Sequence, residues 1–84
     1  MDSRTAAHVL SQIAAYLELL GENPFKSKAY QSAASAILDL GADSLSEPYR
    51  SGELGKLSGL GPATLAVIRD LVETGESRYL EQLR

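Results

Sequence analysis

The chain has no cysteine, no tryptophan and a single histidine among its 84 residues. Without cysteine it cannot form disulfides or thiolate metal sites, and a lone histidine does not make a zinc site. No apolar run approaches the roughly 20 residues that a membrane-spanning helix needs, and the N-terminus lacks a signal-peptide pattern. We therefore expect a cytoplasmic protein that has no membrane partner and no metal held by side chains.

Positive charge is also scarce, with 8 Lys and Arg against 11 Asp and Glu and a formal net charge of −3. Most non-specific affinity for nucleic acid comes from Lys and Arg on phosphates, so this balance argues against strong DNA binding by the chain alone. The charges are unevenly distributed. Lys26 and Lys28 are close together and Lys56 precedes a glycine-rich segment, so a local positive surface is still expected.

The apolar residues recur at helical spacing, and no strand-like alternation is present. They predict a helix over 4–20, which Asp2 or Ser3 caps and Gly21 ends. A second helix is predicted from Pro24 to about residue 40, with Asn23 as its cap. Its expected inward residues are Phe25, Ala29, Ala33, Ile37 and Leu40.

The second half of the chain has shorter helical segments. A short helix beginning near Ser44 or Ser46 and a turn over 53–56 are expected before a helix over 62–74, which Gly75 ends. Ser77 is the predicted cap of a last short helix that buries Leu80 and Leu83. The predicted fold is all-α: one domain over 1–84, a compact bundle of four main helices with short extra helical turns.

A hairpin is expected where Gly59 and Gly61 flank one leucine directly before Pro62. Glycine allows positive φ and close approach of another backbone, and both properties are expected here, at Gly61 in particular. Proline suits the first helical position, where its missing N–H has no intrahelical partner. The free N–H groups at this helix start would suit a phosphate, which predicts a helix-hairpin-helix that binds a nucleic-acid backbone.

Five segments together carry a resemblance to a known family: 21–30, 52–54, the hairpin at 57–64, 73–75 and 79–83. On these segments the chain resembles the small N-terminal domain of family X DNA polymerases, called the lyase domain in DNA polymerase beta, and bacterial members are the most similar. The resemblance covers nearly the whole chain. It implies that the sequence is a piece of a larger polymerase or repair protein.

The resemblance implies DNA as the partner, bound at the 5′-phosphate of a gap by a monomeric domain. It maps a phosphate-binding lysine onto Lys26 and a stacking or hydrogen-bonding aromatic residue onto Tyr30. The predicted DNA-contacting set is Lys26, Tyr30, Lys56, Gly59, Gly61, Ala63 and Thr64. It also implies a monovalent cation, Na⁺ or K⁺, on the backbone carbonyls of Gly55, Leu57 and Leu60, and no other cofactor.

Four positions depart from what the resemblance implies for an active lyase. The Schiff-base lysine falls on Val67, its acidic neighbour on Ala66, and two phosphate-binding lysines on Ala63 and Tyr79. Valine cannot form an imine, so no catalytic residue is predicted in this domain.

Three functions remain open on these grounds. The first is a non-catalytic, sequence-non-specific module that binds the DNA backbone or 5′-phosphate at gaps in repair synthesis, with any polymerase activity residing elsewhere in the full-length protein. The second is an abasic-site (5′-deoxyribose-phosphate) lyase that uses Lys26 or Lys28. The third is a structural or protein-interaction domain without DNA binding, which the acidic balance favours.

Overall fold

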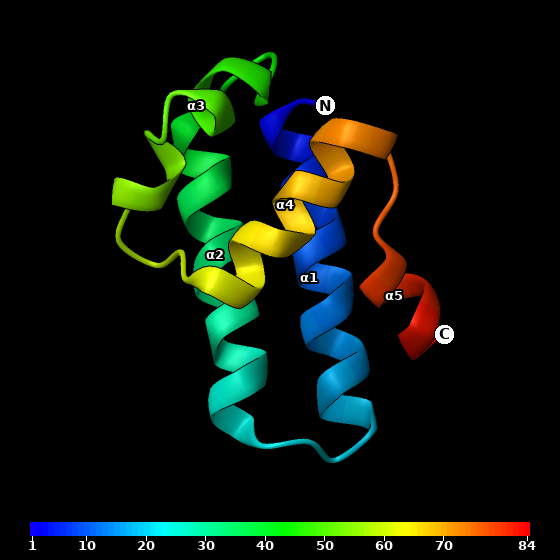
Figure 1. The fold of residues 1–84 in the computed structure, drawn as a ribbon. Helices are drawn as coiled ribbons and strands as arrows, with labels where there is room; N and C mark the ends of the chain where they lie inside the picture. Colours follow the sequence, from blue (N-terminus) through cyan, green and yellow to red (C-terminus); the bar gives the residue numbers. More distant parts are fainter.

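The computed structural model describes residues 1–84 and contains only helices and their connections (Figure 1). The elements are α1 (Ser3–Leu19), α2 (Pro24–Leu40), α3 (Ser46–Arg50), the 3₁₀ turn η1 (Leu54–Lys56), α4 (Pro62–Thr74) and α5 (Arg78–Leu83). The predicted all-α class and the absence of strands are confirmed. Three helices are long, whereas α3 and α5 have five and six residues.

The two longest helices, α1 and α2, form an antiparallel pair, and α4 lies across them while α5 returns along α1 (Figure 1). One apolar core joins the helices, with Leu10, Ile13, Ile37 and Ile68 fully buried at its centre. Burying one such side chain contributes about 1.5–3 kcal/mol. No helix has both the length and the apolar character that crossing a bilayer requires.

The predicted caps are largely confirmed. The side chains of Asp2, Asn23 and Ser77 each accept a first-turn backbone N–H, at 2.7, 2.9 and 3.2 Å. At α3 the residue directly before the helix is Leu45, and its side chain makes no capping hydrogen bond. Instead the Ser44 hydroxyl accepts the Ser46 N–H at 3.3 Å.

The predicted inward face of α2 is wrong in its first half. Phe25 is 78% exposed and Ala29 is exposed, while Tyr30 and Ile37 are buried. Residues four apart advance by about 400° on a helix of 3.6 residues per turn, so a strict series of that spacing winds away from the core. Phe25 consequently lies about 140° around α2 from Tyr30.

The hairpin before α4 uses its two glycines differently from the prediction. Gly59 has a φ of +97°, and a Cβ there would lie 3.2 Å from the Ser32 carbonyl oxygen of α2. Gly61 has a φ of −127° and open space around it, so the expected positive φ at Gly61 is wrong. The close backbone approach is therefore between Gly59 and α2, and it seats the hairpin on the bundle.

Candidate functional site

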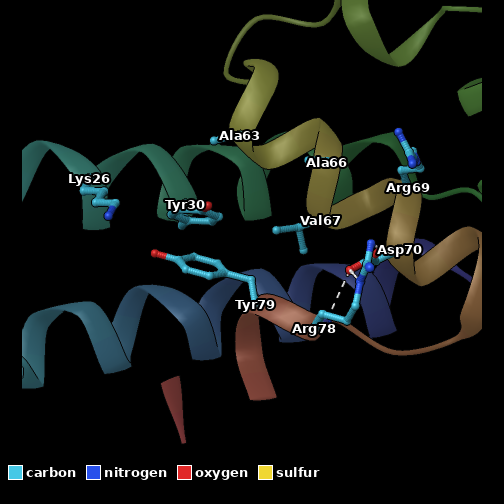
Figure 2. Close-up of a pocket in the computed structure, with 9 residues that line it drawn as sticks. All are labelled: Lys26, Tyr30, Ala63, Ala66, Val67, Arg69, Asp70, Arg78 and Tyr79. Carbon is cyan, nitrogen blue, oxygen red and sulfur yellow. Dashed lines mark hydrogen bonds and ion pairs between the residues drawn. The ribbon is translucent and has the colours of Figure 1, made fainter. Parts of the chain in front are cut away.

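A pocket of about 460 Å³ lies where α2, α4 and α5 meet (Figure 2). Its lining residues are Lys26, Tyr30, Ala63, Ala66, Val67, Arg69, Asp70, Arg78 and Tyr79. All six positions onto which the resemblance maps the lyase or phosphate-binding residues are among them: 26, 30, 63, 66, 67 and 79. Residues that are distant in sequence therefore form one site.

Asp70 and Arg78 also line this pocket, although no motif predicted either of them as a site residue. A helical signal for Asp70 was present, since 63, 66, 67 and 70 follow the i, i+3, i+4, i+7 spacing of one helix face. No comparable signal existed for Arg78. Its place depends on how the connection after Gly75 turns back, which is a tertiary feature.

The middle of the pocket is apolar and has no amine. Ala63, Ala66 and Val67 come from α4 (Figure 2). Val67 is only 4% exposed. A Schiff base requires an unprotonated amine beside the sugar carbonyl. The side chains at the position of the family nucleophile cannot supply one.

Lys26, at one end of the pocket, remains a cation at neutral pH. The Tyr79 hydroxyl and then the Glu22 carboxylate, 3.6 Å from the Lys26 Nζ, raise the pKa of Lys26 above its ordinary value. A raised pKa reduces the fraction of free amine and favours electrostatic contact with an anion. The side chain therefore suits phosphate binding better than nucleophilic attack.

Two tyrosines form one wall of the pocket. The Tyr30 and Tyr79 ring centroids are 5.9 Å apart with an interplanar angle of 34°. Tyr30 is 4% exposed, and burial followed by the proximity of Tyr79 raises its pKa. The hydroxyl of Tyr30 makes no hydrogen bond within the protein, yet no fully buried side-chain oxygen lacks a partner. This hydroxyl therefore keeps contact with the space of the pocket.

The cations at the other end of the pocket are also paired with carboxylates. Arg69 is 3.7 Å from Glu73, and the Arg78 Nη2 is 3.0 Å from Asp70. Asp70 additionally accepts the Arg78 Nε and backbone N–H, at 3.3 and 3.2 Å, and these hydrogen bonds lower its pKa. They tie the start of α5 to α4. With the Lys26 pair, every pocket cation has a carboxylate within 4 Å.

The hairpin offers backbone groups instead of side chains. The N–H groups of Ala63 and Thr64 have no acceptor within the protein. The Thr64 side chain is buried, and its hydroxyl accepts the Gly61 N–H at 2.9 Å, so only its N–H is free for a ligand. Lys56, on the approach to the hairpin, is exposed and has no ion pair.

Two of the three carbonyls expected to hold a cation are also free. The carbonyls of Gly55 and Leu60 accept no hydrogen bond, whereas the Leu57 carbonyl accepts the Leu60 N–H at 3.4 Å. Carbonyl oxygens are suitable ligands for a hard cation.

Residues 1–77 match the family model described as "Helix-hairpin-helix domain". The chain belongs to this family. Over all 84 residues it is 39% identical to the DNA polymerase/3'-5' exonuclease PolX of Bacillus subtilis (strain 168), and it spans 14% of the length of that protein. No solved structure matches the chain. The predicted helix-hairpin-helix is thereby confirmed, and the chain is related to a family X polymerase, as the resemblance implied.

Proposed function

We propose that this helix-hairpin-helix domain is a sequence-non-specific DNA-binding module of a family X polymerase, which holds the backbone or 5′-phosphate of gapped DNA. One observation carries the proposal. Ala63 has a free backbone N–H at the start of α4, and its side chain lines the same pocket as Lys26. The phosphate-binding end of the hairpin is thus continuous with a pocket that has a cation at its edge.

The domain alone binds DNA weakly under this proposal. A phosphate must compete with the carboxylates that already pair with Lys26, Arg69 and Arg78. Each neutralised phosphate contributes about −0.9 to the log–log salt slope on duplex DNA, so two or three contacts give a slope of about −2 to −3. A slope near −6 or a preference for one sequence would indicate a different interface.

The hairpin also fits the cation that the family implies. The free carbonyls of Gly55 and Leu60, with that of Leu57, would hold Na⁺ or K⁺, and the cation would supply positive charge where the chain has little. Replacing KCl by choline chloride at equal ionic strength should then weaken DNA binding. Unchanged binding would remove the cation from the proposal.

Fluorescence anisotropy with gapped DNA, with and without a 5′-phosphate, tests the proposal. Lys26→Ala should weaken binding to the phosphorylated gap about fivefold, equivalent to about 1 kcal/mol. Lys28→Ala is the matched control, because Lys28 is an exposed lysine of the same helix outside this pocket. The absence of binding even at low salt would favour the structural or protein-interaction reading.

The lyase reading is tested by borohydride trapping on a 5′-deoxyribose-phosphate substrate. We expect little covalent adduct, because Val67 occupies the nucleophile position and the pKa of Lys26 is raised. Robust trapping that disappears in Lys26→Ala or Lys28→Ala would place the domain among the enzymes.

A further inference from the structure

The short helix α5 depends on contacts with other helices for its place beside the pocket. It has six residues, and its apolar contacts with the core come from Leu80 and Leu83. An isolated helix shorter than about 12 residues is marginal in water. Contacts with the rest of the protein must therefore hold α5, and with it the Tyr79 side chain, in position.

All hydrogen bonds between α4 and α5 end on one carboxylate. The Asp70 oxygens accept the backbone N–H, the Nε and the Nη2 of Arg78 at 3.2, 3.3 and 3.0 Å (Figure 2). The backbone N–H belongs to the first residue of α5, where a helix has no acceptor of its own. A forked contact of guanidinium and carboxylate fixes direction as well as distance. Asp70 thereby sets where α5 begins and how it is oriented.

Tyr79 is the next residue of α5 and carries this restraint into the pocket. Its ring centroid is 5.9 Å from that of Tyr30, and its hydroxyl is the main cause of the raised pKa of Lys26. If the start of α5 moved, Tyr79 would leave Lys26, whose remaining partner is the Glu22 carboxylate at 3.6 Å. The ammonium would then turn toward Glu22 and away from an anion in the pocket.

We propose that Asp70 and Arg78 are positioning residues for phosphate binding in this domain. They hold Tyr79 beside Lys26 and do not contact DNA themselves. The inference rests on the DNA-binding function proposed above. The alternative is direct contact between a phosphate and Arg78, whose side chain is 82% exposed. The two roles predict opposite effects when the Asp70 charge is removed, because Asp70→Asn frees the guanidinium but releases α5.

The first experiment measures the affinity of the 84-residue chain for 5′-phosphorylated gapped DNA by anisotropy at low salt. Asp70→Asn should bind about fivefold more weakly than the parent, although it removes a negative charge. Glu73→Gln is the matched control: it makes the same charge change on α4 and frees Arg69, and Glu73 accepts no hydrogen bond from α5. It should bind as tightly as the parent, or up to about twofold tighter.

Both variants are compared at a temperature where circular dichroism shows them folded. Binding by Asp70→Asn that equals or exceeds binding by the parent would overturn the inference. Equal weakening in Asp70→Asn and Glu73→Gln would overturn it as well.

A double-mutant cycle then separates positioning from direct contact. Arg78→Gln alone should weaken binding about fivefold, and adding it to Asp70→Asn should weaken binding no further, since both changes break the same link. If Arg78 contacts a phosphate, Arg78→Gln has its larger effect in the Asp70→Asn background, where the guanidinium is unpaired. That result would overturn the inference.

The position of Tyr79 can also be measured without DNA. The ring-proton chemical shifts of Tyr30 and Tyr79 should change in Asp70→Asn and stay as in the parent in Glu73→Gln. Unchanged shifts in Asp70→Asn would overturn the inference. If the parent does not bind gapped DNA, the proposed function fails, and these shifts alone decide whether Asp70 positions Tyr79.

Discussion

The hairpin and the pocket lie next to each other but depend on different parts of the chain. The hairpin offers backbone groups: free N–H groups at Ala63 and Thr64, and free carbonyls at Gly55 and Leu60. Side chains define the pocket, and its centre is Val67 where the resemblance implies a lysine. Binding of a ligand by backbone groups requires only the turn conformation, whereas catalysis in a pocket requires particular side chains. The backbone groups that would bind a phosphate are therefore present, whereas the position of the family nucleophile, Val67, has no amine for a Schiff base.

The role of the hairpin backbone is tested most sharply by a substitution at Gly59. Gly59→Val should destabilise the domain by about 2–4 kcal/mol, because the φ of +97° is strained for valine and its Cβ would press on the Ser32 carbonyl at 3.2 Å. A domain of this size has only about 3–5 kcal/mol from its core, so most of its stability would be lost. Urea unfolding measures the change. A variant as stable as the parent would show that Gly59 does not seat the hairpin on α2.

Gly61→Val should separate binding from folding. Gly61 has extended backbone and open space, so valine there should change stability by less than about 0.5 kcal/mol. Its side chain would stand near the free N–H groups at the start of α4 and reduce affinity for gapped DNA about tenfold, or about 1.4 kcal/mol. Anisotropy and urea unfolding on the same sample check both parts. Unchanged affinity would move the DNA interface away from the hairpin.

The two glycines also show what a sequence can and cannot give. The bounds of the helix over 62–74 were predictable, since Pro62 and Gly75 act locally at its two ends. Which glycine has positive φ was not predictable, because the reason for it is Ser32, 27 positions earlier on α2. Spacing alone revealed that the two glycines make a turn.

The pocket also has features that could not be predicted from the sequence alone. The resemblance placed Lys26, Tyr30 and Val67 in one site, and the structure brings them together. The Asp70–Arg78 pair was missed because it joins two helices across a connection whose path depends on tertiary packing. Phe25 was misplaced because an apolar residue of α2's first turn fits the helical pattern whether or not another helix covers it.

Within the pocket, Asp70→Asn tests the link between α4 and α5. The Asp70 side chain is 14% exposed and accepts three hydrogen bonds from Arg78, so its loss should cost about 1 kcal/mol at pH 7. The folded-state pKa of Asp70 is lowered from 3.8, so its stabilisation is present above that value and is lost as the pH falls through the folded-state pKa. Urea unfolding of both proteins should therefore show a difference at pH 7 that disappears in strong acid. A difference that does not depend on pH would mean that the carboxylate charge is unimportant.

The smallest expected effect comes from the ion pairs that weaken the pocket as an anion site. Glu22→Gln removes the carboxylate 3.6 Å from Lys26 and should strengthen binding to 5′-phosphorylated gaps about two- to threefold at low salt, because an exposed pair is worth only about 0.2–1 kcal/mol. Asp39→Asn is the matched control: it changes the net charge equally, at an exposed position of α2 outside the pocket. If the two variants strengthen binding equally, only the overall charge matters and the pairing of Lys26 has no local role. A gain confined to Glu22→Gln, and lost at high salt, would show that phosphate and carboxylate compete for the same ammonium.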